Sequence, residues 1–368
     1  MSKPKLLYLT FINFELHNIM MSIYKVNKIF SIFVIVLFML LYYSFNVFAD
    51  KGFISIPPIP VREDWQMAII AWNGKEEVMI LSNVLYPVNI KKSLNNSVLY
   101  GIEILPLKNK PEIKGSGYES FYILEKIISR EGLGYQTYGP PALFYKKGDK
   151  IEVIYTKRIG PHYITVLNVN DFYSLTTWLK DYLISKGIFF NNESYLLKYS
   201  SIFKDYMDRG YNFFAIDVVI LNMTDKNSYM VPYIVNPLLY KFSSKCIYYP
   251  LKISAMFTGE TYIKLYLLTS ERIRPEDIHS LGFEIHYEKR IKIKEISHID
   301  HELINLFKGS SKIWLTALTY RGNISNFKKD IEAYTGFSIW QYFHYILFIT
   351  PILLSVIVSL IVIKRMRG

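Results

Sequence analysis

Cysteine is nearly absent from this chain, since Cys246 is the single one among 368 residues. One cysteine excludes any disulfide within the chain, so the folded part must be held together by its hydrophobic core. Cys246 lies in a strand-like run with Ile247 and Tyr248, which is typical of a buried, unreactive thiol. Residues 50–336 are long enough to bury such a core, as one large domain or as two closely packed ones.

Charge is absent from two long runs, residues 29–49 and 337–363, which contain no Asp, Glu, Lys or Arg. Each run is long enough to cross or enter a bilayer. What lies between them, residues 50–336, is therefore expected to be an ectodomain. These two runs predict where the protein sits better than any motif predicts what it does.

The first run has the order of a secretory signal. Lys25 and Lys28 precede an apolar stretch, and Val47-Phe48-Ala49 supplies the small residues that signal peptidase reads. We expect cleavage after Ala49, so that residues 1–49 are the signal region, with Met21 as a start that would give a signal of ordinary length. An uncleaved anchor helix is the alternative, because the apolar core is long for a signal.

The second run, residues 337–363, predicts a transmembrane helix. Trp340 lies where an interfacial aromatic is expected, and Pro351 is tolerated within a membrane helix. The tail, residues 364–368, is basic and therefore stays in the cytoplasm. We expect a single-pass protein of the cell membrane with its ectodomain outside, in contact with the lipid bilayer through this helix.

The net charge is +12, and about half of this excess lies outside residues 50–336. The ectodomain carries only a mild positive excess without the clustered basic stripe of a nucleic-acid binder, so we expect no nucleic-acid partner. Attraction to an anionic cell envelope is the more natural consequence.

Recognisable catalytic motifs are also lacking. No nucleophile elbow, complete metal-ligand set or glycine-rich phosphate loop is present, so we assign no catalytic residue and no cofactor. Lys114-Gly115-Ser116-Gly117 lacks the spacing of a nucleophile elbow and is interpreted as a linker. Glu76, Glu77 and Asp217 would form paired glycosidase acids only if the fold brought them together, and we expect Glu76 and Glu77 to be exposed after a hairpin turn.

His298 and His301 are weak candidates for metal ligands. They lie three residues apart, so that both imidazoles could reach one metal ion from a helix. The order differs from the His-Glu-x-x-His of zinc proteases, and no third ligand is evident. The favoured interpretation is a solvated helix start with Asp300 as the N-cap, and no metal is assigned.

Strand patterns dominate the ectodomain, and helices interrupt them. The expected strands are residues 66–72, 76–85, 97–105, 151–159, 163–169, 211–221, 238–242, 246–256, 261–268, 283–296 and 313–320. The expected helices are residues 118–130, 171–186, 194–208 and a short one near 301–307, with Asp171 or Asn170 as the cap of the second.

Asn73-Gly74 predicts a two-residue hairpin turn, and residues 238–268 look like a meander. Strands outnumber helices without strict alternation, so we predict an α+β fold that is strand-rich and mostly antiparallel. Glycine and proline between residues 131 and 150 mark a boundary at which the ectodomain could divide into two subdomains.

Several short motifs, in this order, resemble a prokaryotic family that is defined by a domain of unknown function. The motifs are Gly160-Pro161-His162-Tyr163, Trp178-Leu179, Tyr206 with residues 210–215, residues 249–254, and residues 315–322 ahead of Asp330. Residues 51–58 and 68–72 also fit the N-terminal pattern of that family. The resemblance thus covers most of residues 50–335.

The resemblance implies a secreted or membrane-anchored protein with a signal peptide and often a C-terminal helix, and it brings no catalytic residue. Many members open with a cysteine-containing Cys-Gly-Gly-Phe stretch, whereas this chain has Lys51-Gly52-Phe53. No disulfide or thiol role is therefore carried over to that site.

Four Asn-x-Ser/Thr sequons lie in the expected ectodomain, where glycans would support the topology. Their asparagines are Asn95, Asn192, Asn222 and Asn323. Two function classes remain. The first is a membrane-anchored binding or cell-envelope structural module with an envelope protein or polymer as partner, and the second is an extracytoplasmic hydrolase with a site assembled from scattered residues.

Overall fold

The computed structural model describes residues 51–56, 61–87, 98–130, 153–188, 193–222, 233–234, 236–257, 259–324, 328–337 and 349–350. All of them belong to one compact unit, Val47–Gly368. The expected signal, residues 1–49, and nearly all of the expected transmembrane helix lie outside the described residues. Within the described residues, no helix has the length and apolarity needed to cross a membrane.

Five strands form an antiparallel sheet, sheet A, in the order β1-β4-β8-β7-β6. Its strands are β1 (Gly52–Ile56), β4 (Val98–Leu107), β6 (Val153–Ile159), β7 (His162–Asn168) and β8 (Phe213–Asn222). β8 is rich in β-branched and aromatic side chains, which pack well on a pleated surface, and it lies at the centre of the sheet. The sheet joins strands from before and after residues 131–150.

A larger sheet, sheet B, has the order β13-β14-β12-β2-β3-β10-β5, with β9 pairing β3. Its strands are β2 (Val61–Trp72), β3 (Glu76–Pro87), β5 (Glu112–Gly115), β9 (Tyr233–Ile234), β10 (Leu238–Ser243), β12 (Glu260–Thr269), β13 (Glu284–Lys292) and β14 (Lys312–Asn323). Among the described strands, β12 and β2 form the one parallel pair. β11 (Ile247–Tyr249) and β15 (Ile331–Ala333) make a separate antiparallel pair.

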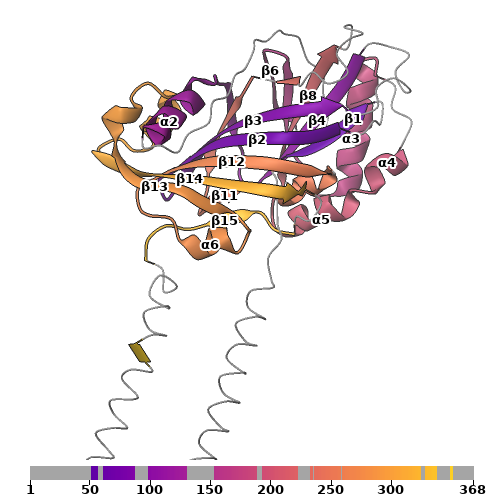
Figure 1. Cartoon of the computed structure of the whole chain (residues 1–368). Coiled ribbons are helices and arrows are strands. Elements are labelled where there is room, and N and C mark those ends of the chain that lie inside the picture. Colours follow the sequence, from indigo (N-terminus) through magenta and orange to yellow (C-terminus); the bar gives the residue numbers. More distant parts are fainter. Residues whose placement is uncertain are drawn as a thin grey trace, which may run out of the picture. The chain divides into compact units, whose positions relative to one another are not determined.

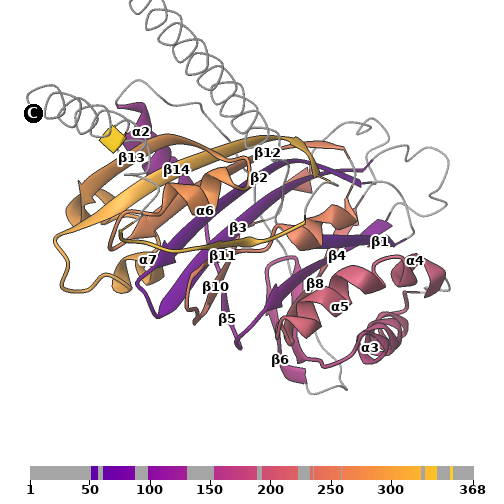
Figure 2. The ribbon, with the colours of Figure 1, turned by 90° about the horizontal axis from the view of Figure 1, so that it is seen from below.

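Helices lie outside both sheets (Figures 1 and 2). On the side of sheet A are α3 (Phe172–Ser185), α4 (Glu193–Leu197) and α5 (Ser200–Asp208), and on the side of sheet B are α2 (Glu119–Ser129) and α7 (His301–Asn305). The remaining short elements are the 3₁₀ helices η2 (Lys252–Met256) and η3 (Ile293–Ile296) and the helix α6 (Pro275–His279).

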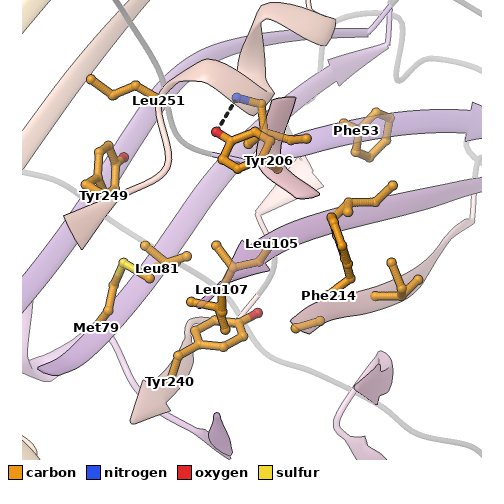
Figure 3. Close-up of a cluster of buried hydrophobic side chains, with 14 of the residues drawn as sticks. Phe53, Met79, Leu81, Leu105, Leu107, Tyr206, Phe214, Tyr240, Tyr249 and Leu251 are labelled. Atoms are coloured by element: carbon orange, nitrogen blue, oxygen red, sulfur yellow. Dashed lines mark hydrogen bonds between the residues drawn. The ribbon is translucent and has the colours of Figure 1, made fainter. Parts of the chain in front are cut away.

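Two hydrophobic cores follow from these layers. The larger core fills the space between the sheets and beneath α3 and α5, and the smaller one lies beneath α2 and α7. Figure 3 shows part of the larger core, where Met79 and Leu81 of β3 lie near Leu105, Leu107 and Tyr240. Such burial must replace the disulfides that the chain cannot form.

The α+β prediction is confirmed, and most expected elements are present with shifted ends. Asp171, one of the two caps expected, is the N-cap of α3, because its side chain accepts a hydrogen bond of 2.8 Å from the Ser174 N–H. The hairpin at Asn73-Gly74 is also present, although its loop has three residues. The Asn73 Oδ1 accepts hydrogen bonds from the Lys75 and Glu76 N–H groups, which closes the loop.

Local patterns misplaced several elements. Residues 246–256 form β11 followed by η2, because the chain leaves the strand at Pro250. β10, β11 and β12 do not form a meander, because they pair with β3 and β5, with β15, and with β2 and β14 respectively. Residues 194–208 divide into α4 and α5, and β15 and α6 were not expected. Residues 131–150 lie outside the described residues, but strands from both sides of them share both sheets.

Candidate functional site

Four charged side chains are buried between the two sheets, and we call them the buried quartet. They are Lys51, Glu103, His162 and Asp217, each at most 4% exposed. Glu103 on β4 and Asp217 on β8 are opposite each other in the register of sheet A, and His162 begins the neighbouring strand β7. Antiparallel pairing therefore brings residues that are distant in sequence onto one face.

Two ion pairs link the buried quartet. The Lys51 Nζ lies 2.6 Å from the Glu103 Oε2 and 5.7 Å from the centre of the Tyr240 ring. The His162 Nδ1 lies 2.5 Å from the Asp217 Oδ2. Two positive and two negative groups cancel when His162 is protonated, which is the condition under which buried charge is tolerated.

Both ring nitrogens of His162 are engaged. The Nε2 lies 2.9 Å from the Asn236 carbonyl oxygen, which can only accept a hydrogen bond, so the Nε2–H donates. Burial lowers the pKa of His162, but the Asp217 carboxylate outweighs that effect and the pKa is raised overall. Both ring nitrogens thus face oxygen atoms, and when the ring is protonated it donates at both and has no free lone pair with which to act as a general base.

A second ionic network joins α5, η2 and β15, and we call it the Arg209 cluster: Asp205, Arg209, Lys252, Asp330 and Glu332. The Arg209 Nη2 lies 2.8 Å from the Asp330 Oδ2, and its Nε donates to the Asp205 Oδ2 at 2.8 Å. The Arg209 Nη1 reaches the Glu332 Oε1 at 3.7 Å, and the Lys252 Nζ lies 2.7 Å from the Asp205 Oδ1. One guanidinium thus connects three carboxylates.

Two tyrosines hold the Arg209 cluster in place. The Tyr206 hydroxyl donates to the Asp330 Oδ1 at 2.5 Å. It also accepts from the Ile253 N–H at 2.9 Å, the bond that is dashed in Figure 3. The Tyr211 hydroxyl donates to Glu332. The Arg209 guanidinium carbon lies 4.6 Å and 4.9 Å from the centres of these two rings, at cation–π distance.

Burial and charge act in opposite directions on the Asp330 carboxyl, which is wholly enclosed. Burial raises its pKa above the ordinary value, and Arg209, the Tyr206 hydroxyl and the Lys252 N–H offset only part of that rise. The same carboxylate holds the pKa of Arg209 above its ordinary value. The Asp330–Arg209 pair is therefore an internal connection between β15 and α5.

A surface hollow of about 310 Å³ opens beside the Arg209 cluster. Besides the five cluster residues, it is lined by Asp277, Ser280, Leu281, Lys328 and Lys329. Lys328 and Lys329 are exposed and have no ion-pair partner in the part of the chain that the structure describes. The hollow offers charged groups of both signs for recognition, and the buried carboxylates behind it are already engaged.

The two candidate metal ligands lie where η3 leads into α7, His298 between these helices and His301 as the first residue of α7. His298 and His301 are both exposed, and the described residues contain no group of three or more His, Cys, Asp and Glu side chains that could hold a metal ion. Asp300 caps α7 as expected, because its side chain accepts from the Glu302 N–H at 3.0 Å. The Glu302 carboxylate instead lies 2.5 Å from Lys114 and 3.3 Å from Lys241.

Two expectations from the sequence, the exposure of Glu77 and the linker at residues 114–117, are corrected. Glu77 is fully buried, not exposed, because its carboxylate accepts a 2.7 Å hydrogen bond from the Tyr248 N–H. Burial raises the pKa of Glu77 well above its ordinary value. Residues 114 and 115 belong to strand β5 and are not a linker.

Cys246 is buried as predicted, and burial raises the pKa of its thiol to about 12.

The four sequons fall in different places. Asn323 is the last residue of β14, and Asn222 is the last residue of β8. Asn95 and Asn192 lie outside the described residues. Glycosylation at these positions stays a prediction.

The sequence drew attention to His162, Tyr206 and Asp330 only through the resemblance, and it missed Arg209 and Glu332. One signal was available for Glu103 and Asp217. Each is a single acid in the middle of a strand that is otherwise apolar on its buried face, which requires a buried partner.

Comparison with solved structures lists a mutated baculovirus P35 after caspase cleavage, at 2.7 Å resolution, with 8% sequence identity and a TM-score of 0.31. That alignment covers 62% of this chain and 75% of the other. No curated protein matches this chain. The family model described as "Uncharacterized protein conserved in bacteria" matches residues 141–334, which include β6 to β15, the whole Arg209 cluster and half of the buried quartet. The chain belongs to this bacterial family, DUF2330.

Proposed function

We infer that this protein is a single-pass, membrane-anchored extracytoplasmic module that binds a partner in the cell envelope. Two uncharged runs, residues 29–49 and 337–363, flank a large folded body, and each is long enough to cross or enter a bilayer. The basic residues beside both runs favour the cytoplasm, which leaves the body outside.

The observation that carries the proposal is the way in which the two ends of the body meet. The Ser254 hydroxyl donates to the Lys51 carbonyl at 2.7 Å, and the Lys252 N–H donates to the Asp330 carboxylate at 2.8 Å. Two residues of η2 therefore hold the two ends of the described body: Ser254 binds its start at Lys51, and Lys252 binds Asp330 near its end. Such closure suits a domain whose chain enters and leaves through one membrane.

The ionic groups favour binding over hydrolysis. Hydrolysis needs a nucleophile or an activated water beside an available base. The buried quartet uses both nitrogens of His162, and the Arg209 cluster holds its carboxylates in ion pairs. The hollow beside Arg209 has the exposed Lys328 and Lys329 among its lining residues, which suits recognition of a charged partner.

Topology is tested with engineered cysteines in the full-length protein, in a Cys246→Ala background that leaves no native thiol. Lys204→Cys lies on an exposed position of α5, and Gly368→Cys lies in the basic tail. A membrane-impermeant maleimide should label the first variant in intact cells and the second only after permeabilisation. Labelling in the opposite order, or of neither variant before permeabilisation, rejects the proposed topology.

Binding is tested by lysine-directed cross-linking in intact cells, followed by mass spectrometry of the linked peptides. Lys328 and Lys329 should form reproducible links to one envelope component, and Lys110, which is exposed elsewhere, serves as the background position. Random links at equal frequency from all three lysines would contradict a specific binding surface at the hollow.

A further inference from the structure

A second hollow, of about 400 Å³, lies where β13 leads into η3 and β14 begins. We call it the lysine hollow, and it is lined by Lys292, Ile293, Lys294, Ser311 and Lys312. Its three lysines are exposed, and none of its lining residues is acidic. β13 lies at the edge of sheet B, on the other side of the body from α5 (Figure 1).

The register places two of these lysines against each other. Lys292 of β13 and Lys312 of β14 are directly opposite in the antiparallel pair. Side chains at opposed positions have their Cβ atoms about 5 Å apart, and like charges there are destabilising. The register therefore places two positively charged residues at directly opposed positions, at a cost in stability.

No described carboxylate offsets this repulsion at ion-pair distance from Lys292, Lys294 or Lys312. Glu295, which is near in sequence, accepts a hydrogen bond of 2.9 Å from the Lys292 backbone N–H. Its carboxylate is thus engaged by the backbone. An anion from outside the chain is the natural counter-charge.

Protection of a sheet edge explains only part of the arrangement. Lysines on an exposed edge strand prevent pairing with other chains, and β13 is such a strand. That reason covers Lys292. It does not cover Lys312, which lies on the interior strand β14, or Lys294, which lies in η3.

We propose that the lysine hollow binds a phosphate group of a multiply charged anion. Lysine ammonium groups bind phosphate as point charges, and the Ser311 hydroxyl adds a donor of the kind that phosphate oxygens accept. Gly309, at φ 90°, turns the chain from α7 towards Ser311 and Lys312, so a tight loop sets their position. The phosphate belongs to a soluble anion or to a lipid headgroup, and the two sources are separated below.

The test compares two double variants that remove the same charge. Lys292→Gln/Lys312→Gln changes the lysine hollow, whereas Lys110→Gln/Lys204→Gln removes two exposed lysines elsewhere that have no ion-pair partner in the described chain. The full-length protein is studied in maltoside micelles, which contain no phosphorus. Pyrophosphate, followed by its ³¹P resonance, is the soluble probe, and added phosphatidylglycerol, followed by native mass spectrometry, is the lipid probe.

The proposal predicts that Lys292→Gln/Lys312→Gln weakens binding of at least one probe by about 30-fold, since each lysine near a phosphate contributes on the order of 1 kcal/mol. The control pair should bind within about twofold of the natural protein, at the same ionic strength. The probe that shows this difference identifies the source. Equal binding by both double variants, or binding of neither probe, overturns the proposal.

A stability measurement guards against misfolding of the double variant. Lys312→Gln alone removes the opposed charge, so it should raise the thermal midpoint in phosphate-free buffer, whereas pyrophosphate should raise the midpoint of the natural protein but not that of the double variant. A lower midpoint for Lys312→Gln would show that the repulsion on which the inference rests is absent.

Discussion

The His162–Asp217 pair makes a sharp prediction about pH. Asp217→Asn keeps the shape of the side chain but removes the counter-charge of the imidazolium. Burial disfavours a charged ring, so His162 should lose its proton in the variant. We expect the variant to lose about 3 kcal/mol of unfolding free energy near pH 6, the lower end of what breaking a buried ion pair costs.

The sign of the pH dependence follows from linkage. The pKa of His162 is raised above its ordinary value of 6.5 in the folded protein. The pair therefore contributes its full stability below about pH 6.5, and this contribution is lost as the pH rises through the folded pKa. Asp217→Asn has no such pair to lose. The difference in unfolding free energy between the natural protein and the variant should therefore become smaller towards alkaline pH.

The assay is urea unfolding of full-length protein in micelles, followed by tryptophan fluorescence from about pH 6 to about pH 9. Asp181→Asn is the matched control, because Asp181 is exposed on α3 and the substitution likewise exchanges one aspartate for asparagine. This variant keeps every other titratable group of the natural protein. It should stay within about 0.5 kcal/mol throughout. If the gap between Asp217→Asn and the natural protein stays constant over this range, His162 does not carry the assigned charge.

Two substitutions and one labelling experiment test the remaining buried groups. Arg209→Gln should cost about 3 kcal/mol of unfolding free energy, measured by thermal unfolding, because it leaves Asp330 buried without its counter-charge. The control Lys204→Gln, on α5, should cost less than about 0.5 kcal/mol. Equal thermal midpoints for the two variants would contradict the role of the cluster. Tyr206→Phe should cost about 1–3 kcal/mol, since Asp330 and the Ile253 N–H both lose a partner, and Tyr173→Phe at a 79% exposed site should be neutral. Cys246 should react with a maleimide at pH 8 only as fast as the protein unfolds, because burial raises its pKa to about 12; rapid labelling of the folded protein would show that the thiol is accessible.

The sequence predicted correctly those elements whose start or turn is set by residues close to them in the chain. The β2–β3 hairpin follows from Asn73-Gly74, and α3 and α7 begin where the aspartates Asp171 and Asp300 cap them. Each of these features depends on neighbours within a few residues. A single sequence contains all of that information.

Pairing between distant segments was not accessible in the same way. Residues 246–249 read as the start of a long strand, but β11 pairs with the three-residue strand β15, which has too few residues for a periodic pattern. β12 and β2 pair in parallel although all the other pairs of described strands are antiparallel. Hydrophobic alternation indicates that a strand has a buried face, and it says nothing about which strand lies beside it.

The burial of Glu77 was missed for the same reason. A glutamate three residues after a turn glycine is usually solvated, and only the Tyr248 N–H, 171 residues later, explains why this one is enclosed.

The ionic networks show what kind of information the sequence did contain. A charged residue in an apolar strand, such as Asp217 in β8, indicates that a partner exists, because an unpaired buried carboxylate costs several kcal/mol. It does not identify the partner, since His162 is 55 residues away and Asp330 is 124 residues from Tyr206. Both networks join the segments that close the body, the first through Lys51 at its start and the second through Asp330 near its end. Because charge pairs tolerate few alternative partners, we argue that their main effect is to fix which segments meet, while the apolar cores supply most of the stability.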